Sequence, residues 1–346
     1  MESQITRNVF CTYTGGDADV ETTIFFISGN PGLISYYHPF LSLLARHLAE
    51  NGESSGQKPA SFRIYGCSLG GFEVEESNVA GSTFQPDTQD NKGDGSRLYD
   101  LEEQICFVQG RLNQVMESSS GKKQKVILIG HSVGTYMAME ILRRHREAAA
   151  ESSQSADFDI IGGIMLFPTV MDIAASPSGQ KLTTLLAIMP HLAIIVSLFA
   201  RMLTFVFPDS ILKNVIRAVM SNPPPHALDT TFTFLKSAGG VRQALHMAAD
   251  EMHSITTDKW TDDVWGVAST KDPVAELFFY FGRNDHWVAE KTRDEIIALK
   301  GRRDGLGPKM FVCEEGLPHA FCLKHNEIMA RKVSEMIKEI GSNTME

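Results

Sequence analysis

The chain has 346 residues, which exceeds most single domains but suits an α/β fold that carries an insertion. Its formal net charge of -10 argues against nucleic acid as a partner, because phosphate binding requires clustered lysine and arginine. The 5 cysteines are scattered without a C-x-x-C pair, which indicates a reduced, intracellular protein rather than a disulfide framework or a zinc site.

Short apolar runs alternate with helical patterns through most of the chain. This alternation predicts right-handed βαβ units and a mostly parallel central sheet covered by helices on both faces. The polar stretches 51–60, 77–96 and 151–156 are expected to be loops or linkers. The expected strands are 23–28, 61–65, 125–130, 160–167, 276–282 and 309–314, and the expected helices are 36–50, 101–118, 135–150, 291–301 and 326–340.

The alternation is interrupted once, over residues 168–275, where no convincing strand pattern occurs. A crossover between parallel strands needs only about a dozen residues. The surplus is mostly helical and strongly apolar, so it is expected to form a lid inserted over the carboxyl edge of the sheet. The predicted organisation is an N-terminal part of an α/β core (1–168), a helical lid that associates with membranes (169–275) and a C-terminal part of the core (276–346).

The pattern G-x-S-x-G, typical of a strand–turn–helix bend that presents a nucleophilic serine, occurs twice. Ser132 follows the buried-type run "KVILI" and precedes "TYMAMEILRRH", whose residues favour a helix. Glycine suits both sides of such a bend, because side chains there would collide with neighbouring backbone. Ser68 is followed by "GGFEVEESNVAGST", a poor helix start. Ser132 is therefore the candidate nucleophile, and Ser68 is interpreted as a loop serine near the rim of the site.

A nucleophilic serine needs a basic histidine, which in turn needs an orienting carboxylate. In this kind of fold both partners follow the serine in the chain, each at the end of a later strand. Asp285 follows the penultimate expected strand, and His319 lies in a loop after the last one. Asp172, after the preceding strand, is an alternative acid. His286 is interpreted as a possible rim contact, and His325 as an ordinary surface residue.

The oxyanion that develops during acyl transfer needs two backbone amide donors. One is expected at Val133, because the amide after the nucleophile and the following helix N-terminus point toward the reacting centre. The second is expected in "GNPG", residues 29–32, which joins an early strand to a helix. Pro31 has no amide hydrogen, so Asn30 is the expected donor and Gly29 the alternative. The same letters also mark an ordinary turn.

One other cluster has the chemistry of metal ligands, since His246, Asp250 and His253 are spaced to share one face of a helix. The arrangement is not H-E-x-x-H and no further ligand can be named, so it is interpreted as a solvated polar face. Neither G-x-G-x-x-G nor a Walker sequence is present. We therefore expect no cofactor and no metal.

Segments covering roughly residues 23–325 resemble the lipid droplet-associated hydrolase family of α/β-hydrolases, with departures in the loop 77–96. In chain order they are "ISGNPGLISYYHPFL", "GHSVGTYMAMEIL", "LFPTVMDIAASPSGQ", "ADEMHSI", "YFGRNDHWV" and "LPHAF". The resemblance implies a serine esterase-type triad on Ser132, Asp285 and His319. It also implies association with the cytosolic surface of the lipid droplet or endoplasmic reticulum, and neutral lipid esters, including sterol esters, as suspected substrates.

Residues 182–200 form an apolar stretch without a formal charge, and the apolar character continues to residue 207. About 20 apolar residues can cross a bilayer, but Pro190 and His191 interrupt the stretch, and one crossing would divide the core between two compartments. We therefore expect a broken helix pair whose apolar face dips into a lipid monolayer, with 182–207 contacting the droplet or reticulum surface. The alternative is a buried lid over the acyl site, and a lid that opens on lipid serves both uses.

The sequence thus predicts a serine hydrolase that cleaves lipid carboxylic esters through an acyl-enzyme. Ser132 would attack, His319 would move the proton, and Asp285 would orient the imidazole. Two alternatives stay open. One is the same fold acting on a small-molecule ester or thioester, and the other is a droplet-surface protein that binds lipid or partners with little turnover.

Overall fold

The structure is a computed structural model, and it describes residues 3–15, 20, 22–53, 61–74, 97–117, 123–151, 158–189, 191–267, 275–302 and 307–343. The expected loop 77–96 and residues 152–156 of the expected linker lie outside these ranges. The expected loop 51–60 begins inside a helix that ends at Glu53, and its remainder also lies outside the described residues.

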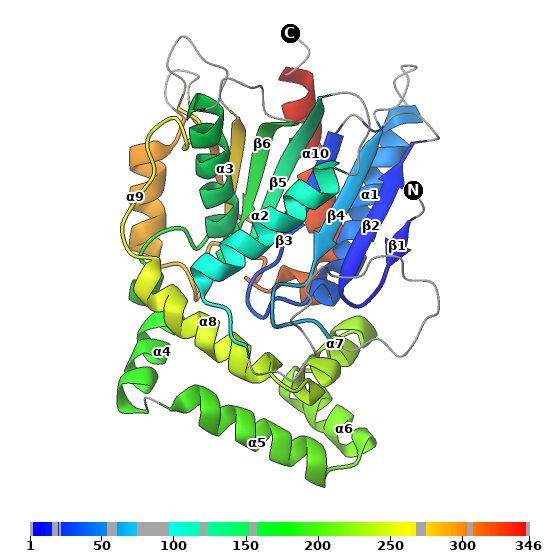
Figure 1. Cartoon of the computed structure of the whole chain (residues 1–346), viewed down its shortest axis with the longest axis vertical. Helices are drawn as coiled ribbons and strands as arrows, with labels where there is room; N and C mark the ends of the chain where they lie inside the picture. Colours follow the sequence, from blue (N-terminus) through cyan, green and yellow to red (C-terminus); the bar gives the residue numbers. More distant parts are fainter. Residues whose placement is uncertain are drawn as a thin grey trace.

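Strands from both halves of the chain form one eight-stranded sheet in the order β1-β2-β4-β3-β5-β6-β7-β8 (Figure 1). Neighbours are parallel from β4 to β8, whereas β1 and β2 form an antiparallel edge. This arrangement confirms the predicted mostly parallel sheet. The strands are β1 Gln4–Ile5, β2 Val9–Thr14, β3 Thr22–Ile27, β4 Phe62–Cys67, β5 Gln124–His131, β6 Phe158–Leu166, β7 Glu276–Phe281 and β8 Lys309–Val312.

The six expected strands are all present, and their bounds differ from the predicted ones by at most two residues. Five of them, β3 to β7, are buried along most of their length, because helices cover both faces and the strands therefore carry continuous apolar runs. The sequence does not predict the antiparallel edge. β1 has only two residues, and β2 mixes buried with half-buried side chains, so neither presents a continuous apolar run.

Helices cover the two faces of the sheet. α1 packs with α10 on one face and α2 with α3 on the other, while α9 connects β7 to β8 (Figure 1). All five helices expected around the core are therefore present. They are α1 His38–Glu53, α2 Leu101–Glu117, α3 Val133–Glu151, α9 Glu290–Lys300 and α10 Asn326–Asn343, with the short 3-10 turns η1 Ile34–Tyr37 and η3 Phe321–Leu323.

The described chain between β6 and β7 contains helices and no strand. These helices gather at one end of the sheet, and α8 lies between the sheet and α5 (Figure 1). This end carries the carboxyl ends of the parallel strands, because α8 accepts hydrogen bonds from Asn30, which follows β3. We use the name lid for α4 to α8. Its elements, after the turn η2 Ile173–Ala175, are α4 Pro177–Ile188, α5 Leu192–Val206, α6 Asp209–Val219, α7 Pro225–Lys236 and α8 Gly240–Ser254.

Among the described residues, no single helix has both the length and the apolar composition needed to cross a membrane. α4 and α5 reach that length and composition only as a pair, and they are bent by 94° at the break between them. The break falls where the sequence predicts one, although Pro190 itself lies outside the described residues.

Candidate active site

Ser132 occupies a sharp turn between the end of β5 and the start of α3. Its φ of 54° lies in the left-handed region, which residues other than glycine rarely adopt. A Cβ on Gly130 would lie 2.5 Å from the carbonyl oxygen of Gly134, and a Cβ on Gly134 would overlap the carbonyl oxygen of Ile27. Glycine is therefore required on both sides of Ser132, and the turn presents the serine hydroxyl at the carboxyl edge of the sheet.

Ser132, His319 and Asp285 form one hydrogen-bonded row. Oγ of Ser132 lies 2.9 Å from Nε2 of His319. On the other side of the ring, Nδ1 of His319 lies 2.9 and 2.7 Å from the two carboxylate oxygens of Asp285. When Nδ1 donates its hydrogen to Asp285, Nε2 can accept the hydrogen of the serine hydroxyl. The structure thus brings together the three residues that the sequence proposes as a triad.

The Asp285 carboxylate is fixed by the turn that follows β7. The residue is buried, and its Oδ1 also accepts the backbone amide hydrogen of Trp287 at 2.8 Å. Asp172, the alternative acid, is exposed and is not among the hydrogen-bond partners of His319 in the described chain. His286 is exposed beside Asp285, and His325 is half-buried before α10. The geometry therefore favours Asp285 over Asp172 as the acid of the row.

Two backbone amides near Ser132 are available to a ligand. In the loop 28–32 after β3, the Gly29 amide donates to the hydroxyl of Tyr37 at 3.2 Å and is therefore occupied. The Asn30 amide has no acceptor among the described residues. The Val133 amide begins α3, where the first amides of a helix have no partner inside the helix. The available donors are thus those of Asn30 and Val133, the pair that the sequence favours over Gly29.

A chain of hydrogen bonds joins the loop 28–32 to His131, which precedes Ser132, and to the backbone of His319. Nε2 of His131 must donate to the carbonyl oxygen of His319, 2.9 Å away, because a carbonyl can only accept. Burial, and secondly the nearby His319, lowers the pKa of His131 to about 3, so its ring is neutral and its Nδ1 accepts. Burial raises the pKa of Tyr37 well above its ordinary value, so its hydroxyl stays protonated and donates to Nδ1 at 2.8 Å. The same hydroxyl accepts from Gly29.

The lid contributes a buried carboxyl that the sequence patterns do not reveal. Glu251 of α8 accepts a hydrogen bond from Nδ2 of Asn30 at 3.0 Å. Burial raises the pKa of Glu251 to about 8, although the bond from Asn30 acts in the opposite direction. The side chain beside the candidate oxyanion donor is therefore bound to an acid that is mostly protonated at neutral pH.

One carboxylate of the expected polar face on α8 caps another helix. Asp250 accepts the amide hydrogen of Leu101, the first residue of α2, at 2.8 Å. A negative charge there is also favoured by the positive end of the helix. His253 is exposed and His246 is half-buried. The interpretation as a wholly solvated face is thus wrong for Asp250, and within the described residues no group of three or more His, Cys, Asp or Glu side chains could hold a metal ion.

Ser68 is buried, so the expectation of a position at the rim is wrong. It follows β4, and its Oγ accepts the amide hydrogen of Ile34 at 3.2 Å. Its own amide donates to the carbonyl oxygen of Asn8 at 2.9 Å. Ser68 therefore supports the start of η1 and joins it to the antiparallel edge of the sheet.

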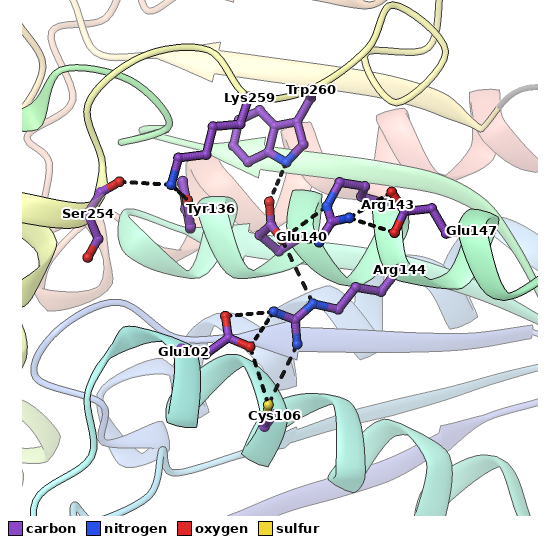
Figure 2. A network of polar contacts seen from close by, with 10 residues as sticks. All are labelled: Glu102, Cys106, Tyr136, Glu140, Arg143, Arg144, Glu147, Ser254, Lys259 and Trp260. Atoms are coloured by element: carbon purple, nitrogen blue, oxygen red, sulfur yellow. Dashed lines mark hydrogen bonds and ion pairs between the residues drawn. The ribbon is translucent and has the colours of Figure 1, made fainter.

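A cavity of about 730 Å³ lies between α2, α3, α8 and the chain that follows α8, and none of the three residues of the row lines it. Its polar side chains bind one another (Figure 2). Oε1 of Glu140 accepts from Nε1 of Trp260 at 2.7 Å, and Arg144 forms an ion pair with Glu102 at 2.6 Å. These contacts join α3 to the chain that follows the lid and to α2, and we call this network of polar contacts the brace.

The lid exposes many large apolar side chains. Phe205 is 91% exposed, Val219 78% and Ile188 73%. The set extends beyond residue 207 into α6, so it is larger than the stretch recognised in the sequence. We call it the apolar lid surface, and it consists of Leu185, Ile188, Ile194, Ile195, Leu198, Phe199, Met202, Phe205, Val206, Phe207, Ile211, Val215 and Val219.

Comparison with known families gives a match over most of the chain. The family described as "Lipid-droplet associated hydrolase" matches residues 20–322. Curated relatives named lipid droplet-associated hydrolase include those of Mus musculus (27% identical over 91% of this chain and 84% of the relative), Gallus gallus (26%, 90% and 83%) and Homo sapiens (25%, 91% and 84%). This match confirms the resemblance found in the sequence.

Several solved structures share this fold and are distant from this chain in sequence. They include haloalkane dehalogenase DbeA from Bradyrhizobium elkani, with a TM-score of 0.55 and 12% identity over 99% of this chain and 98% of that one. A laboratory-evolved potato epoxide hydrolase gives 0.53 and 14% over 98% and 99%, and a serine hydrolase from Cycloclasticus zankles gives 0.52 and 11% over 96% and 94%. At these identities the likeness concerns the fold, and it confirms the predicted α/β-hydrolase architecture.

Proposed function

Because the chain belongs to the lipid droplet-associated hydrolase family and has the α/β-hydrolase fold, it is a hydrolase, and we propose that it cleaves carboxylic esters of lipids through an acyl-enzyme. The observation that carries the proposal is the unbroken hydrogen-bonded row from Ser132 through His319 to Asp285. A serine, an acid and a histidine in this chain order perform acyl transfer in other proteins of this fold. The proposed substrates are neutral lipid esters, including sterol esters.

Ser132 is the proposed nucleophile in the first half of the reaction. As its Oγ attacks the ester carbonyl, Nε2 of His319 takes the hydroxyl proton across the 2.9 Å contact. The imidazolium that forms is stabilised by the buried Asp285 carboxylate, which also holds the ring in the tautomer with its hydrogen on Nδ1. His319 then gives the proton to the alcohol that leaves.

The Asn30 and Val133 amides are the proposed oxyanion hole. Both lack an acceptor in the described structure and follow strands that end at the same edge of the sheet as Ser132. Removing one such donor costs on the order of a hundredfold to a thousandfold in kcat in other acyl-transfer enzymes. In the second half of the reaction, His319 takes a proton from a water that attacks the acyl-enzyme, and the same two amides bind the second oxyanion. The bond from the acyl group to Oγ of Ser132 then breaks, His319 returns the proton to Oγ, and the carboxylic acid leaves.

The apolar lid surface is the proposed contact with a phospholipid monolayer such as that of the lipid droplet or the endoplasmic reticulum. So many exposed large apolar side chains in one segment are unusual for a monomeric protein in water. Exposed basic residues accompany it, namely Lys181, Arg201 and Arg217, and these suit the anionic groups of a lipid surface. The bend between α4 and α5 suits helices that lie in the surface rather than cross it. In the proposed organisation, residues 1–168 and 276–346 form the catalytic core and residues 169–275 form the insertion that meets the lipid.

Replacing Ser132 with Ala tests the chemistry. Full-length protein and the S132A variant are compared on sterol esters, triacylglycerols and 4-nitrophenyl butyrate, and for labelling by a fluorophosphonate probe, which reacts with activated serines. We expect labelling and turnover only in the unmodified protein. Equal labelling and equal lipid-ester turnover in the variant would refute the serine mechanism. Turnover of the short ester alone would favour a small-molecule esterase, and droplet binding without any turnover would favour a binding protein.

A further inference from the structure

The side chain of Asn30 is bound by the lid. Its Nδ2 donates to the carboxyl of Glu251 at 3.0 Å and to the backbone carbonyl of Ala244 at 2.9 Å, and both acceptors belong to α8. Glu251 is only 4% exposed. The loop 28–32 is therefore bound to a helix far along the chain, since Glu251 follows Asn30 by 221 residues.

We propose that Glu251 is a positioning residue for ester hydrolysis, which fixes the Asn30 side chain so that the Asn30 backbone amide points at the developing oxyanion. The inference rests on the proposed function, because it assigns a task to the proposed oxyanion hole. Hydrogen bonds to the Asn30 side chain limit rotation of the residue that carries the amide, and a preorganised donor stabilises an oxyanion better than one that must be reoriented.

The protonation state of Glu251 suits this position. A carboxylate beside the oxyanion hole would repel the charge that develops there, whereas a neutral carboxyl would not. Burial raises the pKa of Glu251 to about 8. Among the described residues, the charged group that interacts with it is Asp250 on the same helix, which also favours the neutral form, and the facing loop contributes the uncharged Asn30.

Holding α8 in place does not require Glu251, because other buried contacts fix this helix. Gln243 exchanges two hydrogen bonds of 2.8 Å with the backbone of Tyr99, and Asp250 accepts from Leu101. Gln243 is 1% exposed and lies two turns before Glu251 on the same helix. It therefore serves as a matched control for the loss of a buried polar contact on α8.

The test compares full-length E251A, E251Q and Q243A with the unmodified protein on 4-nitrophenyl butyrate, with unfolding temperatures measured in parallel. In E251A we expect kcat to fall about tenfold to a hundredfold with little change in KM, less than the loss of a whole donor. E251Q keeps the acceptor oxygen and should retain most of kcat. Q243A should lower the unfolding temperature while keeping kcat. Loss of kcat in E251Q equal to that in E251A, or in Q243A, would show a merely structural role and overturn the proposal.

The pH profile gives a second readout that a structural role would not move. In the unmodified protein, kcat/KM should fall as the pH rises through about 8, because Glu251 becomes charged. E251Q cannot ionise, so this fall should be absent from its profile. Superimposable profiles would overturn the proposal. If the unmodified protein is labelled by fluorophosphonate but E251A keeps its kcat, only the role of Glu251 fails, whereas no labelling and no ester turnover in the unmodified protein refute the proposed function as well.

Discussion

The hydroxyl of Tyr37 lies 2.8 Å from Nδ1 of His131, so that a residue of η1 holds the residue that immediately precedes Ser132. Because the same hydroxyl accepts the amide hydrogen of Gly29, one oxygen atom joins the loop after β3 to the turn after β5. His131 continues the connection to the backbone of His319. Three loops from distant parts of the sequence are thus held at fixed separations around the row of Ser132, His319 and Asp285.

Replacing Tyr37 with Phe should therefore lower kcat by about tenfold or more. The change leaves the Gly29 amide and Nδ1 of His131 without partners in a buried place, which costs roughly 1–3 kcal/mol for each group. The matched control is Tyr36→Phe, since the neighbouring Tyr36 hydroxyl binds Thr231 of α7 at 2.8 Å instead. Hydrolysis of 4-nitrophenyl butyrate measures both variants, and equal kcat in the two would contradict a role for the Tyr37 connection.

Replacing Asp285 with Asn should reduce kcat by several orders of magnitude, about 10⁴-fold in serine proteases that use the same triad. An amide cannot stabilise the imidazolium of His319 and favours the wrong tautomer of its ring. Asp172→Asn serves as the control, because Asp172 is exposed and lies outside the row. Steady-state kinetics of both variants decide between the two acids, and a larger loss in Asp172→Asn would reverse the assignment.

Replacing Gly134 with Ala should destabilise the protein by about 1–3 kcal/mol or more, because the added methyl group would meet the carbonyl oxygens of Ile27 and Ser28 at the end of β3. Gly110→Ala is the opposite case. Gly110 is exposed in the middle of α2, with nothing within 4 Å of an added Cβ, so alanine there should stabilise the helix by up to about 1 kcal/mol. Urea unfolding measures both changes, and a stable Gly134→Ala variant would contradict the tight packing of the turn.

Replacing Phe205 with Asp should weaken binding to triolein droplets coated with phosphatidylcholine by tenfold or more. Transfer of a large apolar side chain from water contributes roughly 1.5–3 kcal/mol, and a charge in its place adds a penalty. Leu299→Asp is the control, because Leu299 is 69% exposed on α9 of the core. Flotation of the droplets measures binding, and turnover of a soluble ester should be unchanged in both variants. Equal droplet binding by the two would argue against the apolar lid surface as the lipid contact.

The stability of the protein should depend on Glu251 between pH 4.5 and about 8. Its native pKa of about 8 exceeds the ordinary value of 4.5, so the native state holds a proton that the unfolded chain releases. The resulting stabilisation is complete below pH 4.5 and is lost as the pH rises to about 8, by up to about 1.4 kcal/mol per pH unit. The difference in unfolding free energy between the unmodified protein and E251Q measures this term. A difference that does not vary with pH would contradict the assigned pKa.

The sequence predicts the parts of the molecule whose signals are local. The turn around Ser132 is specified by the run "KVILI", the glycines at 130 and 134 and the helix-forming run that follows. The apolar runs of β7 and β8 place Asp285 and His319 in the loops after these strands. The antiparallel edge escapes prediction because β1 and β2 lack continuous apolar runs. The place of β2 in the sheet comes from its pairing with β4, which follows it by some fifty residues, and β1 pairs in turn with β2.

The contacts that hold the candidate site depend on the fold and are not visible in the chain. The spacing on α8 draws attention to Asp250, yet the neighbouring Glu251 meets Asn30, because only the packing of the helix shows which side faces the loop 28–32. His131 and Tyr37 each have a local signal. His131 lies between Gly130 and Ser132, and Tyr37 belongs to a pair of tyrosines after "GNPG". Nothing in these signals says that they bind each other.

The brace in Figure 2 has a mechanical consequence for the lid. Where the lid begins, the amide of Ser178 in α4 donates to the carbonyl oxygen of His286. After the lid ends, the indole of Trp260 donates to Glu140 of α3. A segment clamped to the same body at both ends can be displaced furthest in its middle. The middle of the lid is α5 and α6, which carry most of the exposed apolar side chains. A lipid surface would therefore act on the part of the lid that lies furthest along the chain from both attachments.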